Sequence, residues 1–206
     1  LGVSTRGYER SLDPIEPDIQ SRGARKSSVS RGLVQATAEK LAEFVSRDLG
    51  DVDLCAMFID GIEVAGRSVL IALGVTIDGT KVPLGIWAGS SENHVIASAL
   101  LQNLIERGLR VEASTLFVID GGKGLRKALK DVFGDRAVVQ RCQVHKLRNV
   151  RDHLDESRRA YVARQMRDAY ASTTASTAKR KLMQLASWLE SNGEDSAAAS
   201  LREGLD

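Results

Sequence analysis

Two aspartates that directly follow apolar segments are the residues of this chain best suited to chemistry. Residues 54–59 lead into Asp60, and residues 116–119 lead into Asp120. Apolar runs of this length predict strands that are buried on both faces. The carboxyl ends of such strands form the edge of an α/β sheet where ligands tend to bind. We therefore expect both carboxylates at one edge, although an aspartate after a strand is often only a turn residue.

Two carboxylates on rigid strands can bind Mg²⁺, a hard cation that prefers oxygen ligands. In two-metal phosphoryl transfer, one ion activates the attacking oxygen and the other stabilises the leaving oxygen. Mn²⁺ is the alternative to Mg²⁺. This chemistry usually needs a third carboxylate, and none of the other acids ends a comparable apolar run. The sequence therefore predicts a metal site of which only two ligands, Asp60 and Asp120, can be identified.

The elements between residues 51 and 141 must position these carboxylates. Apolar runs predict strands at 67–77 and 81–88, which a hairpin turn at Asp78-Gly79 joins. A helix up to Gly108, the strand ending at Asp120, a helix up to Gly134 and a strand at 137–141 follow. This order is that of a ribonuclease H-like mixed α/β sheet, in which the first strand is central and lies beside the fourth. A doubly wound nucleotide-binding fold is the alternative, but the hairpin argues against it, and residues 121–124 lack the glycine spacing of a phosphate-binding loop.

Residues 1–50 read as an extended arm followed by a helix. Small hydroxyl residues and cations gather where that helix starts, as a helix that enters the DNA major groove requires. The predicted DNA-binding residues there are Arg25, Lys26, Ser28, Ser30 and Arg31. The segment resembles the second half of a helix-turn-helix, and an ordinary capped helix explains it equally well.

Composition narrows the class of protein. The chain has 206 residues, of which 43% are hydrophobic, and this is enough for a core. No apolar run is long enough to cross a membrane. The two cysteines, Cys55 and Cys142, argue against a disulfide framework and for a reducing cytoplasm. The formal net charge is only +2.

The positive charge is concentrated in residues 140–181, where eleven Lys or Arg face four acids. Such a block suits a polyanion such as DNA, although a solvated helix surface has a similar composition. Within it, Lys146, Arg148 and Arg151 are predicted to contact phosphates. Residues 157–206 read as three helices, so we expect a helical appendage after a core at 51–156.

Cys142 and His145 form a Cys-x-x-His pair just after the last predicted strand. A zinc site would need four ligands, and the remaining histidines, His94 and His153, offer no obvious completion. A structural or DNA-positioning role is the favoured interpretation. An ordinary packed cysteine beside a surface histidine is the alternative.

Five segments resemble, in this order, the mutator-type transposases of bacterial insertion sequences: GVSTR (2–6), KSSVSR (26–31), FIDG (58–61), VIDG (118–121) and RCQVHKLRNV (141–150). Members of that family have a ribonuclease H-like domain with an Asp-Asp-Glu triad, a helical insertion before the Glu, and a DNA-binding region ahead of the domain. The resemblance implies that Asp60 and Asp120 are the first two members of the triad. It also implies that residues 157–206, including Trp188, are part of the insertion.

The family's catalytic Glu follows the insertion, shortly after a Thr-Asn pair, and no such stretch occurs in this chain. Glu190, Glu194 and Glu203 lie in the predicted insertion helices. We therefore expect a truncated, inactive transposase whose intact form is a homo-oligomer that acts on double-stranded DNA at terminal inverted repeats and at a target. The alternative is a noncatalytic DNA-binding remnant or regulator. A ribonuclease H-like nuclease outside transposition would leave the arm and residues 142–150 unexplained.

Overall fold

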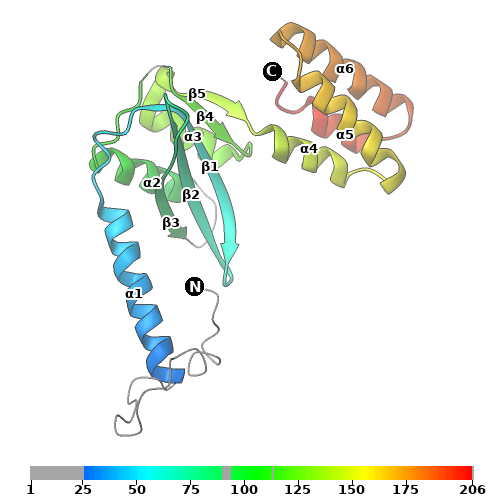
Figure 1. Cartoon of the computed structure of the whole chain (residues 1–206). Coiled ribbons are helices and arrows are strands. Elements are labelled where there is room, and N and C mark those ends of the chain that lie inside the picture. The colour runs from blue at the N-terminus through cyan, green and yellow to red at the C-terminus, as the bar shows by residue number, and fades with distance from the viewer. Residues whose placement is uncertain (1–25, 90–93, 113, 206) are drawn as a thin grey trace, which may run out of the picture. The chain divides into compact units, whose positions relative to one another are not determined.

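The computed structural model of the chain describes residues 26–89, 94–112 and 114–205 (Figure 1). The chain divides into two compact units, residues 1–48 and 49–206. In the first unit, α1 spans Lys26–Ser46 and exposes apolar side chains such as Val34 and Leu41. The helix expected after the arm is present. Because α1 is the one helix that the described part of this unit contains, a helix-turn-helix is not defined, and the arm at 1–25 lies outside the described residues.

The second unit contains a five-stranded sheet and six α-helices among its described residues. In chain order these are β1 (Leu54–Val64), β2 (Arg67–Thr76), β3 (Lys81–Gly89), α2 (His94–Glu106), β4 (Leu116–Ile119), α3 (Lys123–Phe133), the short 3₁₀ turn η2 (Gly134–Arg136), β5 (Val138–Arg141), α4 (Gln143–Asp152), α5 (Glu156–Tyr170), α6 (Ala175–Ser191) and α7 (Asp195–Arg202). The strand order is β3-β2-β1-β4-β5. The first three strands pair antiparallel, whereas β4 pairs parallel with both β1 and β5. The predicted central position of the first strand, beside the fourth, is confirmed.

Two hairpins join the antiparallel strands. The predicted turn at Asp78-Gly79 is confirmed: Gly79 has φ +85°, and its N–H donates to the Thr76 carbonyl at 2.9 Å. The other turn, at Ala65-Gly66, was not predicted, because the first strand was expected to end at Asp60. That expectation was wrong. The antiparallel ladder with β2 continues through the Asp60–Ile71 pair to Val64, so Asp60 lies inside β1.

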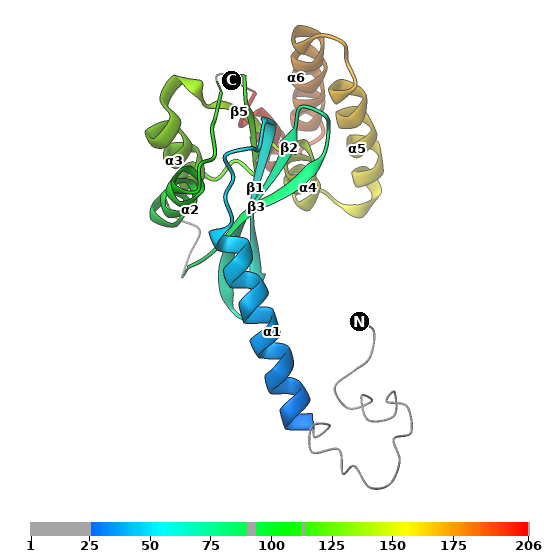
Figure 2. The ribbon, with the colours of Figure 1, turned by 60° about the vertical axis from the view of Figure 1, so that its left-hand side comes forward.

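The core of the sheet lies on one side of it. Helices α2 and α3 pack together there (Figure 2), and the buried side chains of the strands pack against them. Phe117 and Phe133 stack with ring centroids 5.2 Å apart. The expectation that the first strand is buried on both faces was wrong, because its side chains alternate. Met57 is fully buried, whereas Phe58 is 41% exposed on the other face.

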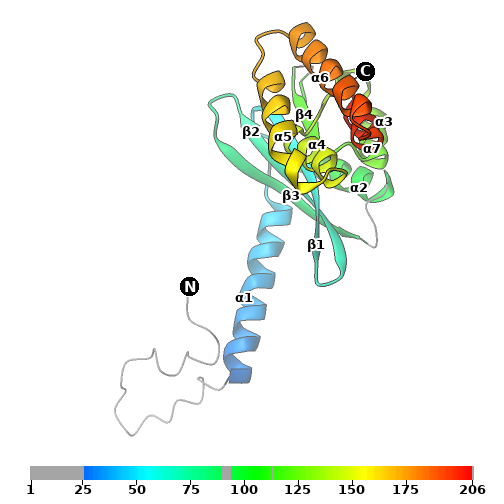
Figure 3. The same ribbon diagram turned by 90° about the vertical axis from the view of Figure 1, so that its right-hand side faces the viewer.

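Helices α4 to α7 have a second hydrophobic core, in which Val150, Met166 and Leu189 are fully buried. Figure 3 shows α5 and α6 side by side in this helical part. The three helices predicted after residue 156 are confirmed. Among the described helices, none has the length and apolar character to span a membrane.

Candidate active site

Asp60 and Asp120 are neighbours across the pair formed by β1 and β4. The parallel register sets Ile59 beside Ile119, and each aspartate is the next residue along its strand. Neighbouring strands are about 4.8 Å apart. Ile59 and Ile119 are both buried, and the aspartates follow these two core residues directly. The two apolar runs therefore end at aspartates that are adjacent across the sheet.

Backbone N–H groups of glycines hold each carboxylate. The Oδ1 atom of Asp60 accepts from the N–H of Gly61 at 3.0 Å, and that of Asp120 accepts from the N–H of Gly122 at 2.8 Å. Gly121, which lies between Asp120 and Gly122 in the chain, has φ +102°, a conformation that favours glycine. Asp120, Gly61 and Gly122 also line a small cavity of about 70 Å³. The glycines after each aspartate thus orient the acid and leave space beside it.

His145 comes from α4 to the same place. Its Nε2 lies 3.6 Å from Oδ2 of Asp60, while its Nδ1 is buried and has no hydrogen-bond partner among the described residues. The segment before α4 is fixed to the sheet because the N–H of Cys142 donates to the Ile119 carbonyl at 2.6 Å. Cys142 is half-buried and is the residue preceding α4. The Cys-x-x-His pair therefore lies at the two aspartates, which the sequence alone could not establish.

The residues present suit a weakly held magnesium ion better than a zinc ion. Within the described ranges there is no group of three or more His, Cys, Asp and Glu that could hold a metal. Zinc sites in proteins need at least three such ligands. Magnesium binds through one or two carboxylates and keeps several waters or phosphate oxygens, so Asp60 and Asp120 fit it.

The predicted DNA-binding residues fall into different environments. Arg25 lies outside the described residues. Lys26, Ser28 and Ser30 belong to α1, but the structure does not describe their side chains. Arg31 and Arg148 are exposed on α1 and α4, respectively, and Arg151 is half-buried. The Nε of Arg151 is buried without a hydrogen-bond partner among the described groups.

Lys146 does not lie where the predicted phosphate contact requires. It is only 5% exposed, and its ammonium donates to the Ser200 carbonyl and lies 3.5 Å from Oε2 of Glu203. Burial, and secondarily the nearby Arg141 guanidinium, lower the pKa of Lys146. Lys146 therefore attaches α4 to α7 and faces inward, and this corrects the interpretation of Lys146 as a DNA contact.

Arg141 is a residue of this site that sequence reasoning missed. It ends β5, and its guanidinium covers Gly121, where an added Cβ would lie 2.6 Å from Nε. Its Nη1 lies 3.2 Å from a carboxylate oxygen of Glu203, and this hydrogen bond lowers the pKa of Glu203. The signal for Arg141 in the sequence was only its place at the end of a short strand.

A comparison with protein families matches residues 1–203 to a single family, described as Transposase, Mutator family. The chain belongs to the Mutator family of transposases. The resemblance in five short segments is thereby confirmed over nearly the whole chain.

Several transposases of this family are similar to the chain. The transposase of element IS905 from Lactococcus lactis subsp. lactis is 30% identical over 188 residues, which are 88% of this chain and 46% of that protein. The transposase of IS6120 from Mycolicibacterium smegmatis is 31% identical over 76% of this chain and 48% of its own length. The transposase of IS256 in Tn4001 from Staphylococcus aureus is 30% identical over 72% of this chain and 38% of its own length. The chain spans less than half the length of each of these Mutator-family relatives.

Proposed function

We propose that this chain is part of an insertion-sequence transposase in which Asp60 and Asp120 serve metal-dependent DNA strand cleavage and strand transfer. The observation that carries the proposal is the register of β1 and β4, which makes these aspartates neighbours. The order β3-β2-β1-β4-β5 supports a ribonuclease H-like core. Membership of the Mutator family supports DNA as the substrate.

In this proposal the two carboxylates hold Mg²⁺, or Mn²⁺ in its place, and the N–H groups of Gly61 and Gly122 keep them oriented. The bound metal supplies positive charge that activates an attacking oxygen and stabilises a leaving one. The Nε2 of His145 lies 3.6 Å from Oδ2 of Asp60, so the imidazole ring is placed beside this carboxylate. His145 adds a ring nitrogen to the site and no third carboxylate.

The proposed partners are double-stranded DNA, namely the terminal inverted repeats of the element and a target, and other copies of the same protein. The exposed Arg31 and Arg148 are proposed to contact phosphates, because exposed guanidinium groups bind phosphate oxygens through paired N–H donors. Arg151 is a weaker candidate because its side chain is half-buried.

A second candidate function, DNA binding without cleavage, is favoured for the 206-residue chain by one observation. The described residues include no group of three or more His, Cys, Asp and Glu side chains that could hold a metal. Two-metal phosphoryl transfer requires protein ligands that hold both metal ions in place. We therefore expect this chain to bind DNA carrying repeat ends and to leave it uncut in Mg²⁺. Strand cleavage by this chain would show that its two carboxylates are sufficient.

Metal binding by the 206-residue chain tests the site itself. Water-proton relaxation in Mn²⁺ solution should increase with the wild-type chain, because bound Mn²⁺ tumbles slowly, and the increase should be largely lost in Asp60→Asn and Asp120→Asn. Glu63→Gln is the matched control, because Glu63 is an exposed acid of the same strand. Retention of the relaxation increase in both aspartate variants would exclude these residues as the metal ligands.

A further inference from the structure

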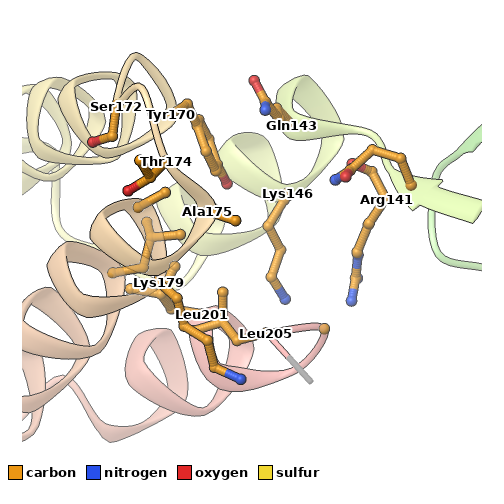
Figure 4. A pocket seen from close by; sticks show the side chains of 14 residues that line it. Arg141, Gln143, Lys146, Tyr170, Ser172, Thr174, Ala175, Lys179, Leu201 and Leu205 are labelled. Atoms are coloured by element: carbon orange, nitrogen blue, oxygen red, sulfur yellow. The ribbon is translucent and has the colours of Figure 1, made fainter.

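A cavity of about 380 Å³ lies within the second unit, where β5, α4, α5, α6 and the end of α7 meet (Figure 4). Figure 4 shows Arg141 on the β5 side and Lys179 on the α6 side, with Tyr170 and Lys146 between them. The described residues that line the cavity include no Asp or Glu. Glu203 lies next to the cavity and forms ion pairs with both Arg141 and Lys146, so its single negative charge offsets one of these two positive charges. The cavity therefore keeps a positive charge.

Two helices begin at this cavity. Gln143 is the first residue of α4, and Ala175 is the first of α6; both line the cavity, as does Thr174, which precedes α6. The first turn of a helix leaves backbone N–H groups without an acceptor in the helix, and in α6 the N–H of Thr177 is satisfied by the side chain of Thr174. The helix dipole adds partial positive charge at the same end, so helix starts favour phosphate groups. Two such starts in one cationic cavity make a stronger anion site than either would alone.

Arg141 and Lys179 are the two cations at opposite sides of the cavity. The Nη1 of Arg141 is bonded to Glu203, but its Nε is buried and has no hydrogen-bond partner among the described groups. An unpaired buried donor costs free energy that an acceptor oxygen would recover. Lys179 is exposed at the rim and makes no ion pair within the described ranges. Lys179 is thus available to an anion, whereas the Nε of Arg141 packs against Gly121.

The cavity is larger than a phosphate group and has an apolar part. Leu182, Leu201 and Leu205 line it together with the ring of Tyr170. Burial raises the pKa of Tyr170, so its ring stays neutral at physiological pH. Aromatic rings give bases a surface for stacking. A ligand that combines an anionic group with a flat apolar group fits this lining.

A second hollow of about 300 Å³ adjoins this cavity. Both hollows are lined by Gln140, Arg141 and Gly204, and the second one also reaches Gly121, the residue after Asp120. Lys123 and Arg126 lie along it and are exposed. Glu203 also lines this second hollow, so cationic and anionic side chains both border it.

We infer that the 380 Å³ cavity binds one unpaired nucleotide of a DNA strand, with its phosphate at Arg141, Lys179 and the two helix starts and its base beside Tyr170. The identity of the polymer rests on the proposed transposase function, whereas the nucleoside phosphate chemistry rests on the cavity. Lys146 contributes to the wall of the cavity, because its ammonium is bonded to Ser200 and not directed to the ligand.

The test uses the 206-residue chain in metal-free buffer with EDTA, so that metal binding at the aspartates plays no part. Isothermal titration calorimetry compares a 5′-phosphorylated deoxytrinucleotide, the same trinucleotide without that phosphate, and inorganic phosphate. We expect the phosphorylated trinucleotide to bind most tightly. Lys179→Gln should weaken its binding about tenfold, the typical value of a charge-assisted hydrogen bond. Arg180→Gln, which removes the neighbouring exposed cation that does not line the cavity, should change binding by less than about twofold.

Two results would overturn the inference. Equal weakening in the Lys179 and Arg180 variants would show a diffuse charge effect and no specific site. Inorganic phosphate that binds as tightly as the phosphorylated trinucleotide would show a plain anion site that does not recognise nucleotides. Circular dichroism of both variants controls for folding. Loss of Mn²⁺ binding in the aspartate variants is independent of both results, so the two proposals fail separately.

Discussion

Lys146 and Arg148 lie two residues apart on α4, and their roles should separate cleanly on substitution. Lys146 is buried and its ammonium is bonded to Ser200 and Glu203, whereas Arg148 is exposed. Both residues were predicted from the sequence to contact DNA. We expect Lys146→Met to reduce stability without affecting phosphate contacts, and Arg148→Met to do the reverse.

The expected change in the free energy of unfolding for Lys146→Met is the sum of opposing contributions. A hydrogen bond from a charged donor contributes about 1.5–3 kcal/mol, and the half-buried Ser200 carbonyl would lose that donor. Methionine has a similar length and fills the same space, so packing is largely kept. Removing the ammonium also removes the cost of burying a charge, the same cost that lowers the pKa of Lys146. A net loss of about 1–2 kcal/mol in the free energy of unfolding is therefore expected.

Two measurements distinguish the stability role of Lys146 from the phosphate contact of Arg148. Urea denaturation gives the free energy of unfolding of each variant, and DNA affinity measured at several salt concentrations gives the slope of log K against log salt. Arg148→Met should reduce that slope by about 0.9, the value for one phosphate contact, and should leave stability within about 0.5 kcal/mol of wild type. The reasoning is refuted if Lys146→Met is as stable as wild type and lowers the salt slope instead.

Three further predictions concern stability. Hydrogen bonding from Arg141 lowers the pKa of Glu203 below its usual 4.5, so this carboxylate stabilises the fold above about pH 4.5 and that contribution is lost as pH falls through the lowered pKa. Glu203→Gln should cost less than about 1 kcal/mol at pH 7, because the side chain is largely exposed, and urea titrations should show the difference from wild type shrinking below pH 4.5. Leu189→Ala, at a fully buried position of the helical core, should cost about 2–5 kcal/mol in thermal denaturation; a loss below about 1 kcal/mol would contradict the packing of α6. Gly121→Ala should destabilise more than Gly79→Ala, because both glycines have positive φ but only at Gly121 would the new Cβ meet Arg141; equal losses would argue against that contact.

Much of the sheet could be predicted from local patterns. The runs ending at Asp60 and Asp120 gave two strands, and the Asp78-Gly79 pair gave a hairpin, because both signals lie within a few neighbouring residues. The order of elements was then enough to expect the first strand beside the fourth. The start of one helix was less accurate, because apolar periodicity predicts a helix only over Lys179 to Glu190. α6 begins at Ala175, where Thr174 caps it by accepting from the N–H of Thr177, a cap that a search for apolar periodicity overlooks.

The packing of distant segments decided the rest. The end of β1 is set by its pairing with β2. The apolar pattern of residues 54–60 contains no information about that pairing. Lys146 looks like a surface cation in a basic block, yet it shares a helix face with the buried Val150, and α7 packs on that face. His145 approaches Asp60 only because the backbone of Cys142 is bonded to the end of β4.

The sequence by itself thus determined which residues carry charge and which segments become strands, because both depend on side-chain type and short-range periodicity. The tertiary structure alone decided which cations face solvent and which groups meet. Contacts such as His145 with Asp60, 85 positions away along the chain, arise from the folding of whole elements onto one another. Their partners cannot be read from a single sequence, because their formation depends on how β5 and α4 are joined in space.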